Sequence, residues 1–312
     1  MPVSLAITAG TPYLARMDAI RLSPPRRLTV PITNRRGAGE MTVLDFGDPK
    51  RPVDLVFVHA NGFNARTYRR LLAPLSGTLR IWAPDLRGHG ATTLPAEPAG
   101  RIDWADYRDD LAALLDRIEG PPVVMAGHSM GGAAALLAAA ERPEKISKML
   151  LLDPVIWPRW VVSVLHLPLL HRLASRNPLV RGAQRRRDRF DSREQALAAY
   201  TGRGAFRGWP EMVLADYLAD GLVETADGFR LACTPAWEAS NYASHRHDPW
   251  RAMKTLRRPV RILKAEAGST CHLSGPPRDL PQVTLETVPG GTHFFPMLQA
   301  DVARDALFDA AV

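Results

Sequence analysis

The chain has 312 residues, of which 46% are hydrophobic and 23% are charged, as in ordinary globular proteins. That length suits one large α/β domain with an insertion, or two domains, and two cysteines, Cys233 and Cys271, exclude a disulfide-stapled scaffold. The net charge of +8 raises the question of nucleic acid, but no nucleic-acid motif accompanies it.

Short apolar segments alternate with longer helical patterns along most of the chain, which predicts a mostly parallel sheet flanked by helices. Several of these segments are apolar almost throughout, as strands covered on both faces are. The predicted strands are 40–47, 53–59, 79–85, 122–127, 146–153, 259–265 and 282–288, and the predicted helices are 67–75, 104–120, 131–143 and 295–310.

The alternation stops between 155 and 242, a stretch rich in Pro, Trp and Arg with helical pieces at 192–200 and 211–222. We therefore expect a core made of 1–154 and 243–312, with 155–242 as a helical cap or lid over one edge of the sheet. The cap contains the basic run Arg181–Arg193, which we interpret as a solvated face. A patch that attracts anionic lipid or an acidic substrate is the alternative.

The N-terminal region lacks the early positive charge and clean apolar run of a signal peptide, and no apolar run reaches the roughly 18 residues of a membrane span. We expect a cytoplasmic protein without a transmembrane segment. Peripheral membrane contact and the oligomeric state stay open.

The motif with the strongest chemical signal is Gly127-His128-Ser129-Met130-Gly131, which follows an apolar strand and precedes an Ala-rich helix. This is the G-x-S-x-G nucleophile elbow, where the serine occupies a strained turn and its neighbours must lack bulk. The helix that begins there directs its free N–H groups at the site. Ser129 is therefore the predicted nucleophile, and a structural turn is the alternative.

Several motifs in order, "FVHANGFNARTYR", "APDLRGHG", "GHSMGG", "LLLDP" and "PGGTHFF", resemble those of the α/β-hydrolase superfamily over roughly 40–310. The resemblance implies an α/β-hydrolase fold and a triad in the chain order serine, acid, histidine. His293 comes last and follows two glycines, so it is the predicted base. His59, His89 and His128 belong to motif loops and are expected to hold backbone geometry.

An oxyanion hole needs two N–H donors aimed at the developing charge. One is expected from Met130, the residue after the nucleophile. Comparison with the family's His-Gly-X loop places Ala60 at the glycine and Asn61 at X, so the Asn61 backbone N–H is the second candidate. Asn61-Gly62 also suits a tight turn, and both interpretations can hold together.

The acid of the triad is harder to identify from the sequence than the serine or the histidine. In most α/β-hydrolases it follows the strand matching 259–265, but there the chain carries Ser269, which cannot bear the charge. Glu266 lies at the strand end, early for reaching His293. Asp153 ends the neighbouring strand 146–153, where some members of the superfamily place their acid. We favour Asp153, with Glu266 as the alternative; Asp153-Pro154 as a mere strand terminator also stays open.

Serine at the nucleophile position disfavours the epoxide-hydrolase and haloalkane-dehalogenase branches, which use aspartate. It suits esters, and we expect a small apolar carboxylic ester as substrate and no cofactor. C–C bond hydrolysis, cofactor-free perhydrolysis and a receptor that keeps its triad but turns over little are the alternatives. His245 and His247 lack a second ligand cluster, so no metal is expected.

Overall fold

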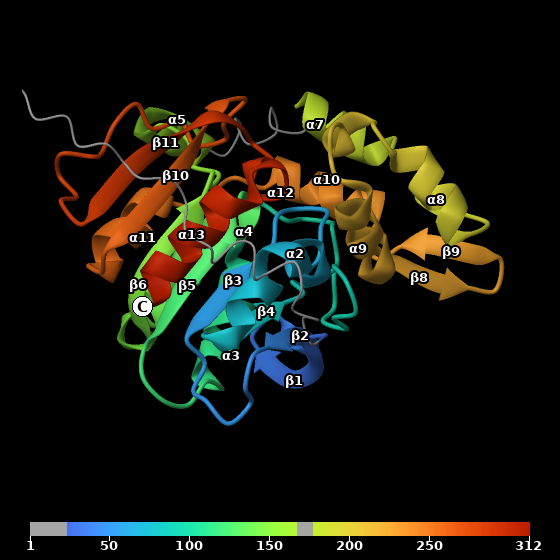
Figure 1. The fold of residues 1–312 in the computed structure, drawn as a ribbon. Helices are drawn as coiled ribbons and strands as arrows, with labels where there is room; N and C mark the ends of the chain where they lie inside the picture. The colour runs from blue at the N-terminus through green and yellow to red at the C-terminus, as the bar shows by residue number, and fades with distance from the viewer. Residues whose placement is uncertain (1–23, 167–176) are drawn as a thin grey trace, which may run out of the picture.

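The computed structural model describes residues 24–166 and 177–312 (Figure 1). Its main sheet has eight strands in the order β1-β2-β4-β3-β5-β6-β10-β11. The β1–β2 and β2–β4 pairs are antiparallel, and every pair from β4 to β11 is parallel. The strands are β1 (Arg26–Asn34), β2 (Gly37–Phe46), β3 (Leu55–Val58), β4 (Ile81–Pro84), β5 (Val123–His128), β6 (Ile146–Leu152), β10 (Val260–Ala267) and β11 (Val283–Thr292). The prediction of a mostly parallel sheet is confirmed.

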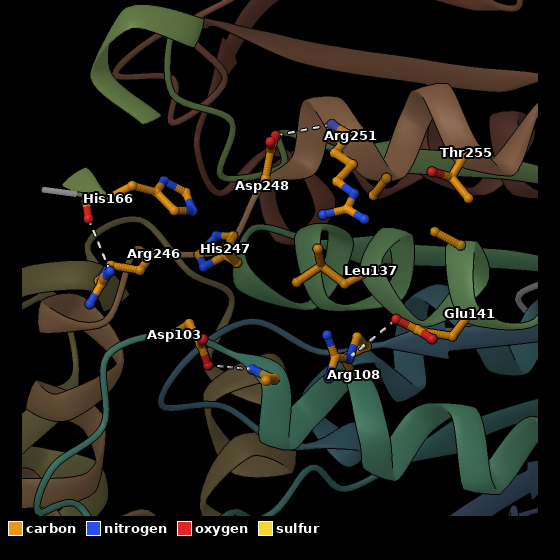
Figure 2. Close-up of a pocket in the computed structure, with 13 residues that line it drawn as sticks. Asp103, Arg108, Leu137, Glu141, His166, Arg246, His247, Asp248, Arg251 and Thr255 are labelled. Atoms are coloured by element: carbon orange, nitrogen blue, oxygen red, sulfur yellow. Dashed lines mark hydrogen bonds and ion pairs between the residues drawn. The ribbon is translucent and has the colours of Figure 1, made fainter. Parts of the chain in front are cut away.

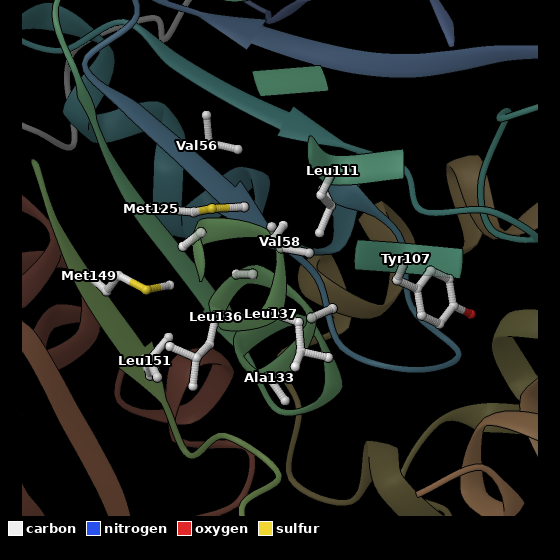
Figure 3. Close-up of a cluster of buried hydrophobic side chains, with 14 of the residues drawn as sticks. Val56, Val58, Tyr107, Leu111, Met125, Ala133, Leu136, Leu137, Met149 and Leu151 are labelled. Carbon is white, nitrogen blue, oxygen red and sulfur yellow. The ribbon is translucent and has the colours of Figure 1, made fainter. Parts of the chain in front are cut away.

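Successive residues of the central strands enter two different hydrophobic cores, because side chains of a strand alternate between faces. Met125 of β5 packs with Leu136 of α4 (Met130–Glu141) in one core, which also includes Leu111 of α3 (Ala105–Asp116) (Figure 3). Ala126 belongs to the other, with Leu307 of α13 (Ala300–Ala311). Burial on both faces explains why these strands are apolar throughout.

The helices of the core follow the predicted ranges with local breaks. Segment 67–75 forms η1 (Ala65–Tyr68), α2 (Arg69–Leu72) and η2 (Ala73–Gly77), and the last predicted helix divides into α12 (Phe295–Leu298) and α13. The remaining core elements are η3 (Pro143–Lys145) and α11 (Pro249–Leu256), which packs against α4.

One strand of the main sheet, β1, was not predicted. It pairs antiparallel with β2, from Arg26 opposite Asp45 to Asn34 opposite Gly37. Pro31 lies within it, and proline is tolerated there because β1 is at the edge of the sheet.

The segment 155–242 lies between β6 and β10 and contains strands as well as helices, so the expectation of a purely helical insertion is wrong in that respect. A three-stranded antiparallel sheet of order β7-β9-β8 accompanies the helices. The elements are α5 (Arg159–Leu165), α7 (Pro178–Gln184), β7 (Arg189–Phe190), α8 (Arg193–Tyr200), η4 (Gly204–Phe206), α9 (Glu211–Gly221), β8 (Leu222–Thr225), β9 (Gly228–Leu231) and α10 (Pro235–Ala243).

The insertion is firmly joined to the core. Asp216 of α9 accepts a hydrogen bond from Arg69 Nε at 2.9 Å, and Asn64 Nδ2 donates to the Tyr217 carbonyl at 2.9 Å. Phe206 and Trp209 lie in the same buried cluster as Leu307 of the core. The insertion and the core therefore share one hydrophobic interior.

Five arginines of the Arg181–Arg193 run are exposed, but Arg186 is not. Its guanidinium donates to Glu238 Oε2 at 2.8 Å and to the Tyr217 hydroxyl at 2.5 Å. Among the described helices, none is long and apolar enough to cross a membrane.

Candidate active site

Ser129 lies on a sharp turn between β5 and α4, with φ 57° and ψ −123°, a backbone conformation unusual for a residue other than glycine. The turn packs so closely that side chains are excluded on both sides. A Cβ on Gly127 would lie 2.7 Å from the backbone of Gly131, and one on Gly131 would collide with the carbonyl oxygens of Val58 and His59. The two glycines thus allow the elbow to form.

His293 directly follows β11 and is held from two sides. Its Nδ1 is 2.6 Å from Asp153 Oδ2, and its carbonyl oxygen is 2.8 Å from His128 Nε2. Burial lowers the pKa of His128 to about 3, so that ring is neutral and can donate through Nε2 while Nδ1 accepts from the Tyr68 hydroxyl at 2.7 Å. His128 neighbours Ser129, so this bond ties the histidine loop to the elbow.

Asp153 is completely buried directly after β6, with φ 41°. Besides His293, its carboxylate accepts hydrogen bonds from Ser269 Oγ at 2.5 Å, from the Ala265 N–H at 2.9 Å and from the Thr270 N–H at 3.0 Å. Burial alone would raise the pKa of Asp153, but the hydrogen bond and charge of His293, with the Ser269 and Ala265 bonds, lower it to about 2. The carboxylate is therefore ionised at neutral pH.

The other acid candidate, Glu266, lies at the exposed end of β10. Its Oε2 accepts from the Gly290 N–H at 2.7 Å, which fastens β10 to the strand before the histidine. Among the described contacts, Glu266 makes no hydrogen bond to His293. The structure thus brings Asp153 and His293 together, while Ser269 lies behind Asp153 as a donor.

Backbone N–H groups at Asn61 and Met130 have no hydrogen-bond acceptor among the described residues. Met130 is the first residue of α4, where N–H groups lack an intrahelical partner. In the loop Ala60–Ala65, every other N–H has a partner, namely Tyr68 Oη, His89 Nε2, Ala60 O, Thr67 Oγ1 and Asp85 Oδ1. The loop therefore leaves a single donor, that of Asn61, available.

The side chain of Asn61 makes contacts that the sequence did not reveal. Its Oδ1 accepts from Asn241 Nδ2 at 2.7 Å, and its Nδ2 donates to the Glu238 carbonyl at 3.1 Å, both on α10. These residues are about 180 positions apart and share no motif, so no sequence signal could have found the pair.

A pocket of about 470 Å³ lies away from these residues, between α4, α11 and the start of α3 (Figure 2). Its wall includes three arginines and three carboxylates, Arg108, Arg246, Arg251, Asp103, Glu141 and Asp248, so its formal charges balance. His247, also at its wall, stacks on Trp104 with 4.0 Å between ring centroids. In the described ranges, no group of three or more His, Cys, Asp or Glu side chains could hold a metal ion.

A family model described as "Alpha/beta hydrolase family" matches residues 55–306. "Lipase LipV" of Mycobacterium tuberculosis is 40% identical over 108 residues, which is 35% of this chain and only 40% of that protein. "2-(acetamidomethylene)succinate hydrolase" of Mesorhizobium japonicum is 24% identical over 256 residues, or 81% of this chain and 86% of that protein. The crystal structure of E-2-(acetamidomethylene)succinate hydrolase matches with a TM-score of 0.69 at 21% identity, covering 91% of this chain and 98% of that one, a likeness of fold.

Proposed function

The chain belongs to the alpha/beta hydrolase family, and from that premise we propose that it is a serine hydrolase that cleaves a small apolar carboxylic ester. The observation that carries the proposal is the 2.6 Å contact between His293 Nδ1 and an ionised, buried Asp153, in a loop tied to the strained turn of Ser129. The proposed nucleophile, acid and base, Ser129, Asp153 and His293, follow the chain order that the fold uses for acyl transfer.

In the proposed reaction, Ser129 Oγ attacks the ester carbonyl while His293 Nε2 takes the hydroxyl proton. Asp153 accepts the Nδ1–H of His293, which leaves Nε2 free as the base and stabilises the imidazolium that forms. The imidazolium then gives its proton to the departing alcohol, and an acyl-Ser129 ester remains. His293 takes a proton from a water molecule as the water oxygen attacks that ester. The imidazolium then protonates Ser129 Oγ as it leaves, which releases the acid and restores the free serine.

The negative oxygen of each tetrahedral intermediate would be bound by the N–H groups of Asn61 and Met130. Support comes from the hydrogen bonds of the surrounding loop, which occupy the neighbouring donors and leave that of Asn61 available. Donors already oriented before the reaction need no reorganisation as charge develops, which is why such sites accelerate acyl transfer strongly.

Aromatic rings next to the proposed donors and base favour an apolar substrate. Phe63 lies in the same loop as Asn61, and Phe294 follows His293; the centroids of these two rings are 6.2 Å apart. Trp209 of the insertion packs against both, at 5.2 Å and 5.9 Å. We propose that residues 155–242 form a cap whose rings line the substrate site, with 1–154 and 243–312 as the catalytic core.

Labelling and turnover test the function together. The wild type should react with a fluorophosphonate at Ser129 and hydrolyse short p-nitrophenyl esters, and Ser129→Ala should abolish both while keeping the melting temperature. The variant Trp209→Ala should shift the preference toward longer acyl groups. A wild type that is neither labelled nor active on any acyl length would exclude the proposal, and leave the non-catalytic receptor as the better account.

A second candidate is hydrolysis of a compound like the one named for the Mesorhizobium relative, 2-(acetamidomethylene)succinate. What favours it is the extent of that match, which covers 81% of this chain, whereas the lipase match covers 35%. Turnover of this compound that exceeds turnover of every simple ester would move the assignment to it.

A further inference from the structure

We infer that Asn241, in helix α10 of the insertion, is a positioning residue for the oxyanion hole; the inference rests on the proposed function. Asn241 is fully buried, and it reaches the reaction only through Asn61, whose side-chain oxygen accepts its Nδ2–H at 2.7 Å.

The orientation of the Asn241 amide is determined by its own partners. Its Oδ1 accepts from the Tyr107 hydroxyl at 2.9 Å and from the Arg101 guanidinium, which is also paired with Asp106. Trp104 Nε1 donates to its backbone carbonyl at 3.2 Å. With two donors on the oxygen, the NH₂ group must point the other way, toward Asn61.

The Asn61 side chain is consequently held at both ends. Asn241 binds its oxygen, and the Glu238 carbonyl, one turn earlier on α10, binds its nitrogen. Glu238 is itself fixed by the buried guanidinium of Arg186. A shift of the Asn61 Cα, which would carry its N–H out of place, would have to break both amide contacts.

The core holds the peptide that carries the Asn61 N–H, and the peptide after it, through other atoms. The Ala60 carbonyl accepts from His59 Nδ1 at 2.8 Å, and the Gly62 N–H donates to His89 Nε2 at 3.1 Å. The core thus fixes the peptides on either side of the Asn61 Cα, and the insertion adds the two contacts that hold the Asn61 side chain between them. The proposed cap would therefore act on the chemical step as well as on substrate choice.

The test compares Asn241→Asp with Ser240→Ala by the rate of Ser129 labelling with a fluorophosphonate and by kcat and KM on p-nitrophenyl acetate. Aspartate keeps the Arg101 and Tyr107 bonds but turns an acceptor toward Asn61 Oδ1. Ser240→Ala removes the neighbouring Arg101 contact and the bond from its hydroxyl to the Trp237 carbonyl, and leaves the contacts of Asn61 in place. We expect Asn241→Asp to lower the labelling rate and kcat by about tenfold or more with KM little changed, since loss of a whole oxyanion donor costs roughly 10²–10³. Ser240→Ala should match the wild type.

Asn61→Ala tests the same contact from the other side, because it removes the side chain and keeps the backbone N–H, and it serves if Asn241→Asp does not fold. It should show the same fall in kcat. Labelling at the wild-type rate in the folded variants, or a change in KM alone, overturns the positioning role and leaves the hydrolase assignment standing. A wild type that cannot be labelled overturns both.

Discussion

Two aspartates at the carboxyl edge of the sheet are both completely buried, but their pKa values are shifted in opposite directions. Asp85 follows β4, and Asp153 follows β6. Burial raises the pKa of Asp85 to about 7, while the pKa of Asp153 is lowered to about 2. Asp85 accepts two backbone N–H bonds, from Ala65 at 2.8 Å and Ala91 at 3.1 Å.

The two pKa values differ because the two carboxylates accept hydrogen bonds from different donors. Asp153 receives a histidine ring N–H and a hydroxyl in addition to two backbone N–H groups, and these outweigh the cost of burial. A triad acid must stay negative beside an imidazolium, and of these two aspartates it is Asp153 whose environment suits the proposed role. Asp85 instead ties together the loops that follow β3 and β4.

From the comparison of the two aspartates we expect the largest effect, a loss of kcat, when Asp153 is substituted. Asp153→Asn should lower kcat by about 10⁴, because an amide cannot hold His293 in the tautomer that leaves Nε2 free. Turnover at saturating ester, on a variant with a native melting temperature, measures this. A variant that keeps a tenth of the wild-type kcat would return the acid role to another residue.

The next effect concerns how the free energy of unfolding changes with pH. A carboxyl with a raised folded-state pKa stabilises the fold when protonated, so the contribution of Asp85 is present below about pH 4 and is lost as the pH rises through about 7. Between pH 5 and pH 7.5 this loss should be on the order of 2 kcal/mol.

Urea unfolding of the wild type and of Asp85→Asn at pH 5 and pH 7.5 measures this loss of stability. Buried histidines such as His59, whose pKa burial lowers to about 4, give a slope of opposite sign, but they are present in both proteins. The difference between the two proteins therefore isolates Asp85. Parallel pH profiles would show that Asp85 does not titrate in this range.

An effect on stability of similar size is expected at Ser269, which supplies the short hydroxyl bond to Asp153. Ser269→Ala should raise the pKa of Asp153 and destabilise the fold by about 1.5 to 3 kcal/mol, the range for hydrogen bonds to charged groups. Chemical denaturation measures this, with Ser274→Ala, an exposed serine in the same loop, as the control. Equal stability of the two variants would contradict a role for the hydroxyl.

The smallest effect is expected at Glu266. Glu266→Gln should change kcat by less than about twofold, because an amide oxygen can still accept the Gly290 N–H and its surface contact contributes little. The assay is the one used for Asp153→Asn. A loss of several hundredfold in this variant alone would make Glu266 the acid.

Much of the fold and of the candidate site could be predicted from local patterns. Central strands such as β3 and β5 are buried and almost wholly apolar, and all the strands from β2 to β11 of the main sheet lie within a few residues of the predicted ranges. Ser129 and His293 lie in motifs whose glycines are required by close packing, and Asp153 terminates a predicted strand. Their catalytic roles stay predictions.

Other features have no local signature. β1 carries Pro31 and a mixed sequence, and the strands of the small sheet, 189–190, 222–225 and 228–231, are too short for a period to be read. Arg186 lies in a run of exposed arginines and only tertiary packing buries it. The pair Asn61–Asn241 joins residues that only the folded insertion brings together.

The adjacency of β6 and β10 has a consequence for how such a site can change over evolutionary time. Ser269 Oγ lies 2.5 Å from Asp153 Oδ1, so an aspartate at 269 would bring a second carboxylate to hydrogen-bonding distance of the first. Two carboxylates that close cannot both ionise, and one would retain its proton and compete for His293. A chain with aspartate at both strand ends would therefore keep one of them protonated, so only one of the two could supply the negative charge that His293 needs.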